Sequence, residues 1–336
     1  MNPALRPAWP RVVIVCPASA EANNGNWRTA RRWQTLLRGH AQVRIVQHWP
    51  DAQAARDTLM LALHARKSAE AAQAWHAQRG AGGLGVVLTG TDLYPDITRD
   101  ALALRTLALA DGLLVLQPQA LQALPEAVRA RAQVVLQSCP ARPTLAKTTQ
   151  RLRVLMVGHL REEKNPAMLW RAVQALPPQA GVLVEHIGQA LSPAMAQAAQ
   201  AVSERCPHYR WLGPRTHGQT LQRIQRAHLL VHTSRSEGGA IVLSEALRCG
   251  TPVLATRIPG NVGVLGSDYE GLVAPDDDAA LARLLLRCRQ EQPAHEAAGL
   301  LQRWQRQCAA RAPLFAPERE QAALLAWLQR LQGAAN

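Results

Sequence analysis

The residues best suited to chemistry lie in SRSEGGAIVLSEALRCGTPVLAT, which runs from Ser234 to Thr256. Glu237 stands directly before two glycines, and a second carboxylate, Glu245, follows eight positions later. The preceding HLLVHTS predicts a strand, and AIVLSEALRC, which ends at Gly250, predicts a helix. Glycines at such a junction let backbone N–H groups approach a phosphate, and the helix dipole favours its charge. We therefore predict an anion site here, with Glu237 beside it and Glu245 placed to bind a diol such as a ribose.

Two series of short apolar runs must position these residues. The first half has six β-rich runs, at 11–17, 43–49, 59–65, 85–90, 112–117 and 132–138, separated by helical stretches such as 28–38 and 68–78. The second half repeats the pattern at 152–160, 181–188, 209–213, 228–234, 251–256 and 270–275. This alternation is typical of α/β domains with parallel sheets.

The proline-containing stretch CPARPTLAKTTQR predicts a linker near residue 145 between two Rossmann-like domains that face each other across a cleft. We expect an N-terminal domain at 1–145, a C-terminal domain at 146–315 and a closing helix at 316–336. The ligand is expected at the carboxyl ends of the strands.

Composition narrows the function classes. The net charge of +14 favours anionic partners, such as phosphorylated small molecules. No basic tract with interleaved aromatics, helix-turn-helix or zinc-finger spacing predicts nucleic-acid binding. No run is long enough to span a membrane, and the N-terminal apolar run is too short for a signal peptide. The scattered cysteines favour a reduced, cytoplasmic protein, and no feature predicts an oligomeric state.

The donor motif resembles that of the family-four retaining glycosyltransferases of the GT-B fold. The resemblance implies that Glu237 contacts the donor sugar and Glu245 the nucleotide ribose. It also implies that the backbone of Gly238, Gly239 and Ala240 contacts the diphosphate or sugar. No resident cofactor or metal is implied.

The stretch VGHLREEKNP occupies the place of the family's basic pair. Lys164 matches the lysine expected on the donor diphosphate, where a cation would stabilise the leaving group. His159 stands where the family usually has arginine, and Arg161 is the nearby residue that could supply this charge.

The first half carries candidates for the acceptor. Gly25 and Asn26 match the family's glycine-containing loop after the first strand, and Arg28 opens the next helix. His64, Arg66 and Lys67 follow the third strand and predict an anion site.

The stretch after the fourth strand departs from the family pattern. Where many members have a histidine, this chain has Thr89, Thr91 and Asp92. A sugar hydroxyl usually needs help to lose its proton, whereas an acceptor that is already anionic does not need it to the same degree.

Taken together, NNGNWRTARRW, LHARKSA, LTGTDLYPDI and VGHLREEKNP resemble the selenosugar synthases of selenoneine biosynthesis. These GT-B enzymes join a UDP-sugar to selenophosphate. The resemblance implies UDP-N-acetylglucosamine or UDP-glucose as donor and selenophosphate as acceptor.

Two other function classes stay open. One is a family-four transferase acting on a saccharide or lipid hydroxyl, for which the basic, Trp-containing helix at 28–39 would suit membrane docking. The other is a non-catalytic protein, either a nucleotide-sugar sensor or a nucleic-acid binder attracted by the net charge. The pair Glu237 and Glu245 argues against the nucleic-acid binder.

Overall fold

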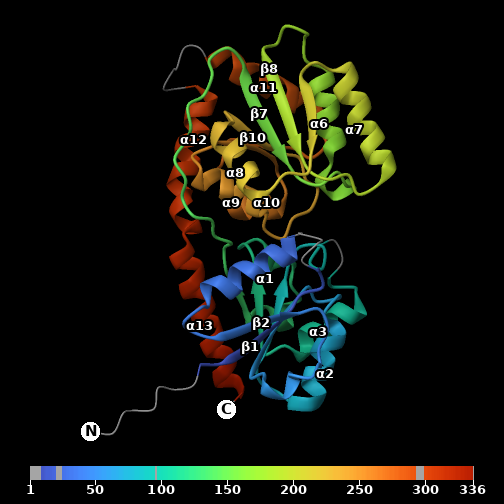
Figure 1. Ribbon diagram of the computed structural model, residues 1–336, viewed down its shortest axis with the longest axis vertical. Helices are drawn as coiled ribbons and strands as arrows, with labels where there is room; N and C mark the ends of the chain where they lie inside the picture. The colour runs from blue at the N-terminus through green and yellow to red at the C-terminus, as the bar shows by residue number, and fades with distance from the viewer. Residues whose placement is uncertain (1–8, 20–24, 95–96, 293–298, 336) are drawn as a thin grey trace, which may run out of the picture. The chain divides into compact units, whose positions relative to one another are not determined.

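The computed structural model describes residues 9–19, 25–94, 97–292 and 299–335 (Figure 1). The chain forms two compact units: residues 1–137 with 317–336, and residues 138–316. Asn23 and Asn24 of the first-domain motif, and Pro95 and Asp96 of LTGTDLYPDI, lie outside the described residues.

The first unit is built on a parallel sheet with strand order β2-β1-β3-β4-β5-β6. Its strands are β1 (Arg11–Val15), β2 (Gln42–Val46), β3 (Leu59–Leu63), β4 (Leu84–Leu88), β5 (Gly112–Val115) and β6 (Ala132–Val134). Its helices are α1 (Gly25–Leu36), α2 (Ala69–Arg79), α3 (Ala101–Leu109), α4 (Ala120–Ala123), α5 (Glu126–Arg129) and α13 (Pro317–Ala335). A 3-10 turn, η1, spans Ala54–Arg56.

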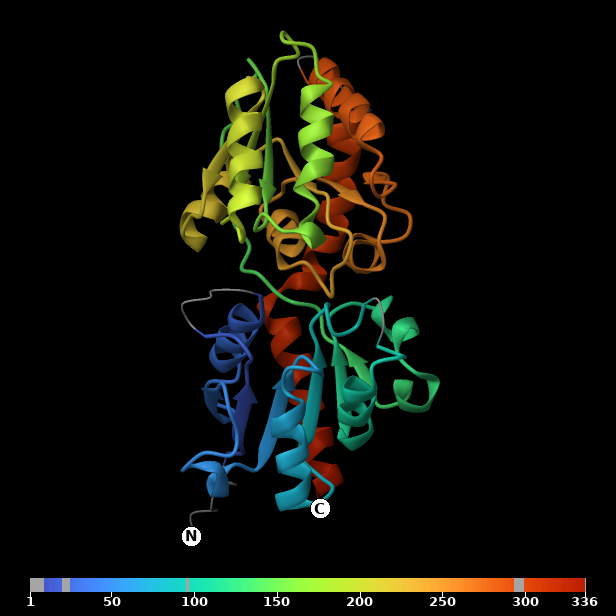
Figure 2. The same cartoon turned by 90° about the vertical axis from the view of Figure 1, so that its right-hand side faces the viewer.

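Two separate hydrophobic clusters cover the two faces of the first sheet. Val13 and Met60 pack with Trp75 of α2, whereas Ile14 packs with Trp33 of α1 and Trp327 of α13. Figure 2 shows α13 (red) and α2 (light blue) on opposite sides of this sheet. Because both faces are covered, the central strands β3, β4 and β5 are buried throughout and their sequences are continuous apolar runs, whereas the edge strands β2 and β6 are partly exposed.

The second unit contains a sheet with strand order β12-β11-β10-β7-β8-β9, and its strand pairs are parallel. Its strands are β7 (Leu152–Val157), β8 (Val182–Ile187), β9 (Tyr209–Gly213), β10 (Leu229–His232), β11 (Val253–Thr256) and β12 (Leu272–Val273). Its helices are α6 (Pro166–Gln174), α7 (Pro193–Arg205), α8 (His217–Arg226), α9 (Ile241–Arg248), α10 (Pro259–Leu265), α11 (Asp278–Glu291) and α12 (Leu300–Arg311). The 3-10 turns η2 (Glu162–Lys164) and η3 (Ala312–Phe315) complete it.

The prediction of two Rossmann-like α/β domains is confirmed, and each predicted apolar run overlaps a strand. The units divide differently from the expected ranges. The chain leaves the first unit after Gln137, earlier than the predicted boundary near 145, and residues 317–336 belong to the first unit.

Helix α13 belongs to the first unit because its apolar side chains complete that unit's core. Leu324, Trp327, Leu328 and Leu331 are buried there. The Trp327 ring lies against Gly85 and Gly112, where a Cβ would approach it to 2.6 and 3.0 Å. Among the described helices, none combines the length and apolar character needed to cross a membrane.

Candidate active site

The loop after β10 places Glu237 between a lysine and a histidine. Its Oε1 lies 2.5 Å from Nζ of Lys164, which belongs to η2 after β7. The same oxygen accepts a hydrogen bond from Nε2 of His232, the last residue of β10, at 3.0 Å. Since β7 and β10 are neighbouring parallel strands, both loops leave the same edge of the sheet. The predicted residues Glu237 and Lys164 are thus brought together.

The charge of Glu237 is fixed by these partners. Burial opposes ionisation, but the Lys164 ammonium and the His232 hydrogen bond outweigh it and hold the pKa of Glu237 well below its ordinary value. Burial also lowers the pKa of His232, whose side chain is 1% exposed. The site therefore presents a carboxylate, an ammonium and a neutral imidazole at neutral pH.

The loop after β7 is held in place by its backbone. Asn165 has a left-handed conformation, φ 48°, which asparagine tolerates better than most residues. Its backbone carbonyl accepts from Thr233 Oγ1 at 2.9 Å, and its side-chain Nδ2 donates to Asp276 Oδ1 at 2.9 Å. A side chain at Gly188 would overlap the backbone carbonyl of Gly158, so this glycine allows the loops after β7 and β8 to touch. These contacts position Lys164.

The other two predicted residues of this loop have different partners. The His159 ring accepts a hydrogen bond from the backbone N–H of Gln189 at 3.2 Å. Arg161 Nε lies 3.8 Å from a carboxylate oxygen of Glu163, and the Arg161 side chain is 38% exposed.

Glu245 lies on α9, buried, and its Oε1 is 2.7 Å from Nε2 of His217. His217 opens α8, and its side chain is half exposed. Gly238, Gly239 and Ala240 precede the helix, and Ala240 is its N-cap residue. The structure therefore adds His217 to the predicted set.

Helix α10 supplies a second contact that the sequence analysis did not identify. Gly260, in its first turn, lies directly against Glu237, and a Cβ on Gly260 would sit 2.7 Å from the Glu237 Cβ. The next residue, Asn261, is fully buried and donates to the carbonyl of Thr256 at 2.9 Å. Helix α10 thus forms a wall beside Glu237.

The run Asp276–Asp278 has the Asp-x-Asp spacing of many metal-binding carboxylates, but its side chains have protein partners. Asp276 pairs with Arg235 at 2.8 Å and Asp278 with Arg171 at 2.7 Å, whereas Asp277 caps α11 through the Ala280 N–H. Within the described ranges, no group of three or more His, Cys, Asp and Glu is arranged to hold a metal ion.

In the first unit, Asp92 ties two loops together. Its carboxylate accepts backbone hydrogen bonds from Ala65 at 2.8 Å and from Thr89 and Gly90 at 2.9 Å. The loops after β3 and β4 are thereby joined at the carboxyl edge of the sheet. Asp92 is fully buried and is held by these backbone hydrogen bonds, so its role in the structure is to join the two loops.

His64 stands beside Thr91 in this joined loop pair. Its Nε2 lies 3.1 Å from Thr91 Oγ1, and its backbone has φ 77°, a strained conformation for histidine. Burial lowers the pKa of His64 despite the opposing charge of Asp92, so the ring is neutral at pH 7. A histidine from the loop after β3 therefore lies next to the loop after β4, in which the sequence showed no histidine.

The predicted cations of the first unit differ in their partners. Arg66 Nε lies 2.6 Å from Asp100 Oδ2, and Arg66 Nη1 donates to the carbonyl of Thr91 at 2.8 Å. Lys67 is exposed, and no residue in the described part of the chain forms an ion pair with its ammonium. Gly25, Asn26 and Arg28 lie in the first turn of α1, which follows β1, the sheet neighbour of β3.

The chain resembles known glycosyltransferases in sequence and in fold. Residues 140–299, most of the second unit, match the family model described as Glycosyl transferases group 1. An uncharacterized glycosyltransferase of Methanocaldococcus jannaschii is 33% identical over 73 residues, which are 22% of this chain and 21% of that relative.

Two solved structures resemble nearly the whole chain. HepE from Anabaena, in complex with UDP and glucose, has a TM-score of 0.72 at 18% identity, over 95% of this chain and 99% of that chain. Sucrose-phosphate synthase from Thermosynechococcus elongatus has a TM-score of 0.74 at 18% identity, over 98% and 100%. The chain therefore has the GT-B fold, and residues 140–299 of its second unit are similar to the group 1 glycosyltransferases.

Proposed function

We propose that this protein is a glycosyltransferase that joins the sugar of UDP-N-acetylglucosamine or UDP-glucose to selenophosphate and releases UDP. The observation that carries the donor half is the cluster of Lys164, Glu237 and His232 at the carboxyl end of β10. Its support is the group 1 family match over 140–299 and the fold shared with HepE, whose structure contains UDP and glucose.

The donor would replace contacts that the protein makes with itself. Lys164 and Glu237 neutralise each other across 2.5 Å, and Glu245 is paired with His217. A bound UDP-sugar offers a diphosphate to Lys164, sugar hydroxyls to Glu237 and ribose hydroxyls to Glu245. Arg161 and His159 lie on the same loop and stay candidates for the diphosphate. As the C–O bond to UDP breaks, its electron pair leaves with UDP, and the Lys164 charge stabilises this product.

The acceptor would bind in the first unit. Lys67 and Arg28 supply positive charge, the neutral His64 and Thr91 supply hydrogen bonds, and the Gly25–Asn26 turn begins α1. The selenium lone pair attacks the anomeric carbon to form the carbon–selenium bond. Water then cleaves the selenium–phosphorus bond, giving the selenosugar and phosphate. No resident cofactor or metal is part of this proposal.

A hydroxyl acceptor is the second candidate, and one observation favours it. The neutral His64 could take a proton from a sugar hydroxyl, which a selenium nucleophile would not require. The membrane-docking version has less support, because Trp33 and Leu37 at α1 are buried in the first unit's core. These apolar side chains are therefore not available to a lipid surface.

The deciding experiment is mass spectrometry after anaerobic incubation with UDP-N-acetylglucosamine, UDP-glucose and fresh selenophosphate. We expect a selenosugar mass with matching UDP release, lost in Glu237→Ala and retained in Glu162→Gln, a control on an exposed neighbouring residue. UDP release without a selenium product would overturn the selenophosphate acceptor and favour a hydroxyl acceptor. No UDP release with either donor would overturn the proposed donor and favour a nucleotide-sugar sensor.

A further inference from the structure

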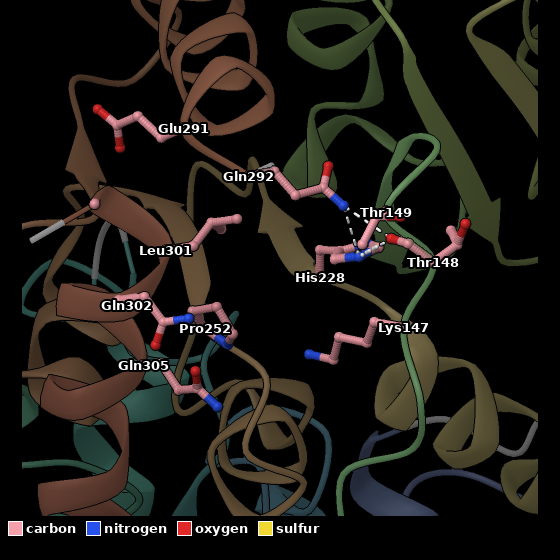
Figure 3. A pocket seen from close by; sticks show the side chains of 11 residues that line it. Lys147, Thr148, Thr149, His228, Pro252, Glu291, Gln292, Leu301, Gln302 and Gln305 are labelled. Atoms are coloured by element: carbon pink, nitrogen blue, oxygen red, sulfur yellow. Dashed lines mark hydrogen bonds between the residues drawn. The ribbon is translucent and has the colours of Figure 1, made fainter. Parts of the chain in front are cut away.

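A cavity of about 140 Å³ lies in the second unit, and its lining does not include Glu237. Figure 3 shows the side chains that line it. Lys147 and the residues after it, which lead into β7, form one side, and His228 and Pro252, which precede β10 and β11, form the base. Residues of α11 and α12 close the remaining side. The cavity therefore lies at the amino ends of the strands, whereas Glu237 follows a carboxyl end. Four residues of β10 separate the two ends by about 13 Å.

One wall of the cavity is fixed by hydrogen bonds. The Arg153 backbone N–H donates to Nδ1 of His228 at 2.9 Å, which leaves the proton on Nε2, and Nε2 lies 2.9 Å from the Thr148 carbonyl. Gln292 donates to the same carbonyl at 2.9 Å. Burial lowers the pKa of His228 to about 4, so this ring is neutral at physiological pH. These side chains are thus held in place before any ligand binds, and this wall carries no net charge.

Lys147, the residue before Thr148, supplies a cation beside this wall. Figure 3 shows its side chain extending into the space between His228 and Pro252. The chain has only three lysines, Lys67, Lys147 and Lys164, beside 38 − 3 = 35 arginines. Among the residues that the structure describes, no carboxylate forms an ion pair with Lys147, in contrast to Lys164. A partly desolvated ammonium without a counter-charge is costly, and an anion placed beside it would lower that cost.

The lining favours a singly charged organic ligand over a phosphate. Pro252 and Leu301 present apolar carbon, and Glu291 adds a carboxylate. Burial opposes the charge of Glu291, but the Leu300 N–H at 2.6 Å and Arg287 at 2.7 Å keep its pKa below the ordinary value. One ammonium near a fixed carboxylate matches a monoanion better than a dianion. The volume suits a molecule about the size of a benzene ring.

We propose that this cavity binds a small organic monocarboxylate, with its acid group on the Lys147 ammonium and its carbon skeleton against Pro252 and Leu301. The Gln305 amide borders the same space, and beside its hydrogen bond to the Gly250 carbonyl it has a second N–H that can donate to the other carboxylate oxygen. The site is independent of the proposed transfer reaction, because it shares no residue with the cluster around Glu237.

Binding should weaken as the pH rises. Burial lowers the pKa of Lys147 to about 8, so the ammonium loses its proton above that pH unless an anion holds it. The groups around it are His228, which is already neutral, Cys249, whose pKa burial raises to about 11, Glu291 and the fixed charge of Arg153. None of these groups loses a positive charge between pH 6.5 and 9.5. A decline in ligand affinity over this range therefore reports the deprotonation of Lys147.

Benzoate is the probe, and benzyl alcohol is its uncharged control. We expect calorimetric titration of the full chain to detect benzoate and not benzyl alcohol. We also expect binding to weaken at least about tenfold in Lys147→Met, as for the loss of a hydrogen bond to a charged group. Arg283→Met, which removes an exposed cation of α11 outside the cavity lining, should bind benzoate as the unchanged protein does. Equal binding by Lys147→Met, or equal binding of the alcohol, would overturn the proposal.

Amine labelling tests the same site without a substitution. Formaldehyde and borohydride should methylate Lys147 more slowly when benzoate is present, while labelling of Lys67 in the same sample is unchanged. Mass spectrometry resolves these sites because the chain has so few lysines. If benzoate leaves Lys147 labelling unchanged, the proposal fails, even where Lys147→Met does not fold.

Discussion

Glu237 receives both of its observed partners through one oxygen, which leaves its other oxygen to a ligand. Its importance could be predicted from the sequence, because a carboxylate before a glycine pair at a strand end has a specific chemical meaning. His232 could not be identified in this way. A histidine inside an apolar run is indistinguishable from a core residue until the ring is seen to reach five positions along the chain.

We expect His232→Leu to lower kcat/KM for UDP-sugar turnover by about tenfold to a hundredfold, since a hydrogen bond to a charged group contributes about 1.5–3 kcal/mol. His232→Gln keeps an N–H donor and should recover part of the loss. His208→Leu, at another buried histidine of the same unit, serves as the control for lost stability. An equal kinetic loss in His208→Leu would assign the effect to folding.

The strands in the described part of the chain could be predicted because most of them are apolar runs bounded by turn residues, the pattern of a sheet covered on both faces. Helix α10 was missed because its sequence, PGNVGVL, contains proline and two glycines, which favour a turn over a helix. Gly260 is needed for the close packing of this helix against Glu237. The wall that α10 forms beside Glu237 therefore could not be predicted from the sequence, because this segment has weak helical propensity.

Gly260→Ala should displace Glu237, because the added methyl group meets the Glu237 backbone and Cβ. We expect a loss of about 1–3 kcal/mol in the free energy of unfolding, typical of overpacking, together with loss of UDP-sugar turnover. Gly218→Ala, in the first turn of α8 with no atom within 4 Å of the added Cβ, should keep both properties. Denaturant titration and UDP release measure them, and full activity in Gly260→Ala would contradict this account.

At the scale of the whole molecule, the sequence predicted two similar units and misassigned where they end. A closing helix at the end of the chain was expected, but no local pattern states which sheet such a helix covers. The answer lies in Gly85 and Gly112, more than 200 positions before Trp327, whose missing side chains make room for that ring. Such complementarity depends on tertiary contacts and cannot be found from hydrophobic periodicity.

Trp327→Ala should destabilise the first unit by about 3–5 kcal/mol, the usual cost of removing a buried tryptophan side chain. Hydrogen exchange should rise in peptides from residues 11–137 and stay unchanged in peptides from 152–290, because the two units have separate cores. Gln329→Ala, at an exposed position of the same helix, is the matched control. A uniform rise across both units would show that they unfold together.

Because α13 belongs to the first unit, it also determines the order in which the two units can complete folding during translation. Translation delivers all strands of the first sheet before the second unit begins, yet the segment that seals one face of that sheet arrives after residue 316. The second unit, an uninterrupted stretch of chain, can finish folding while the first still exposes Leu61, Val87 and Leu114 to solvent. The unit that is translated first is therefore the last to complete its fold. Until α13 arrives, its exposed apolar sheet face is a surface that chaperones can recognise.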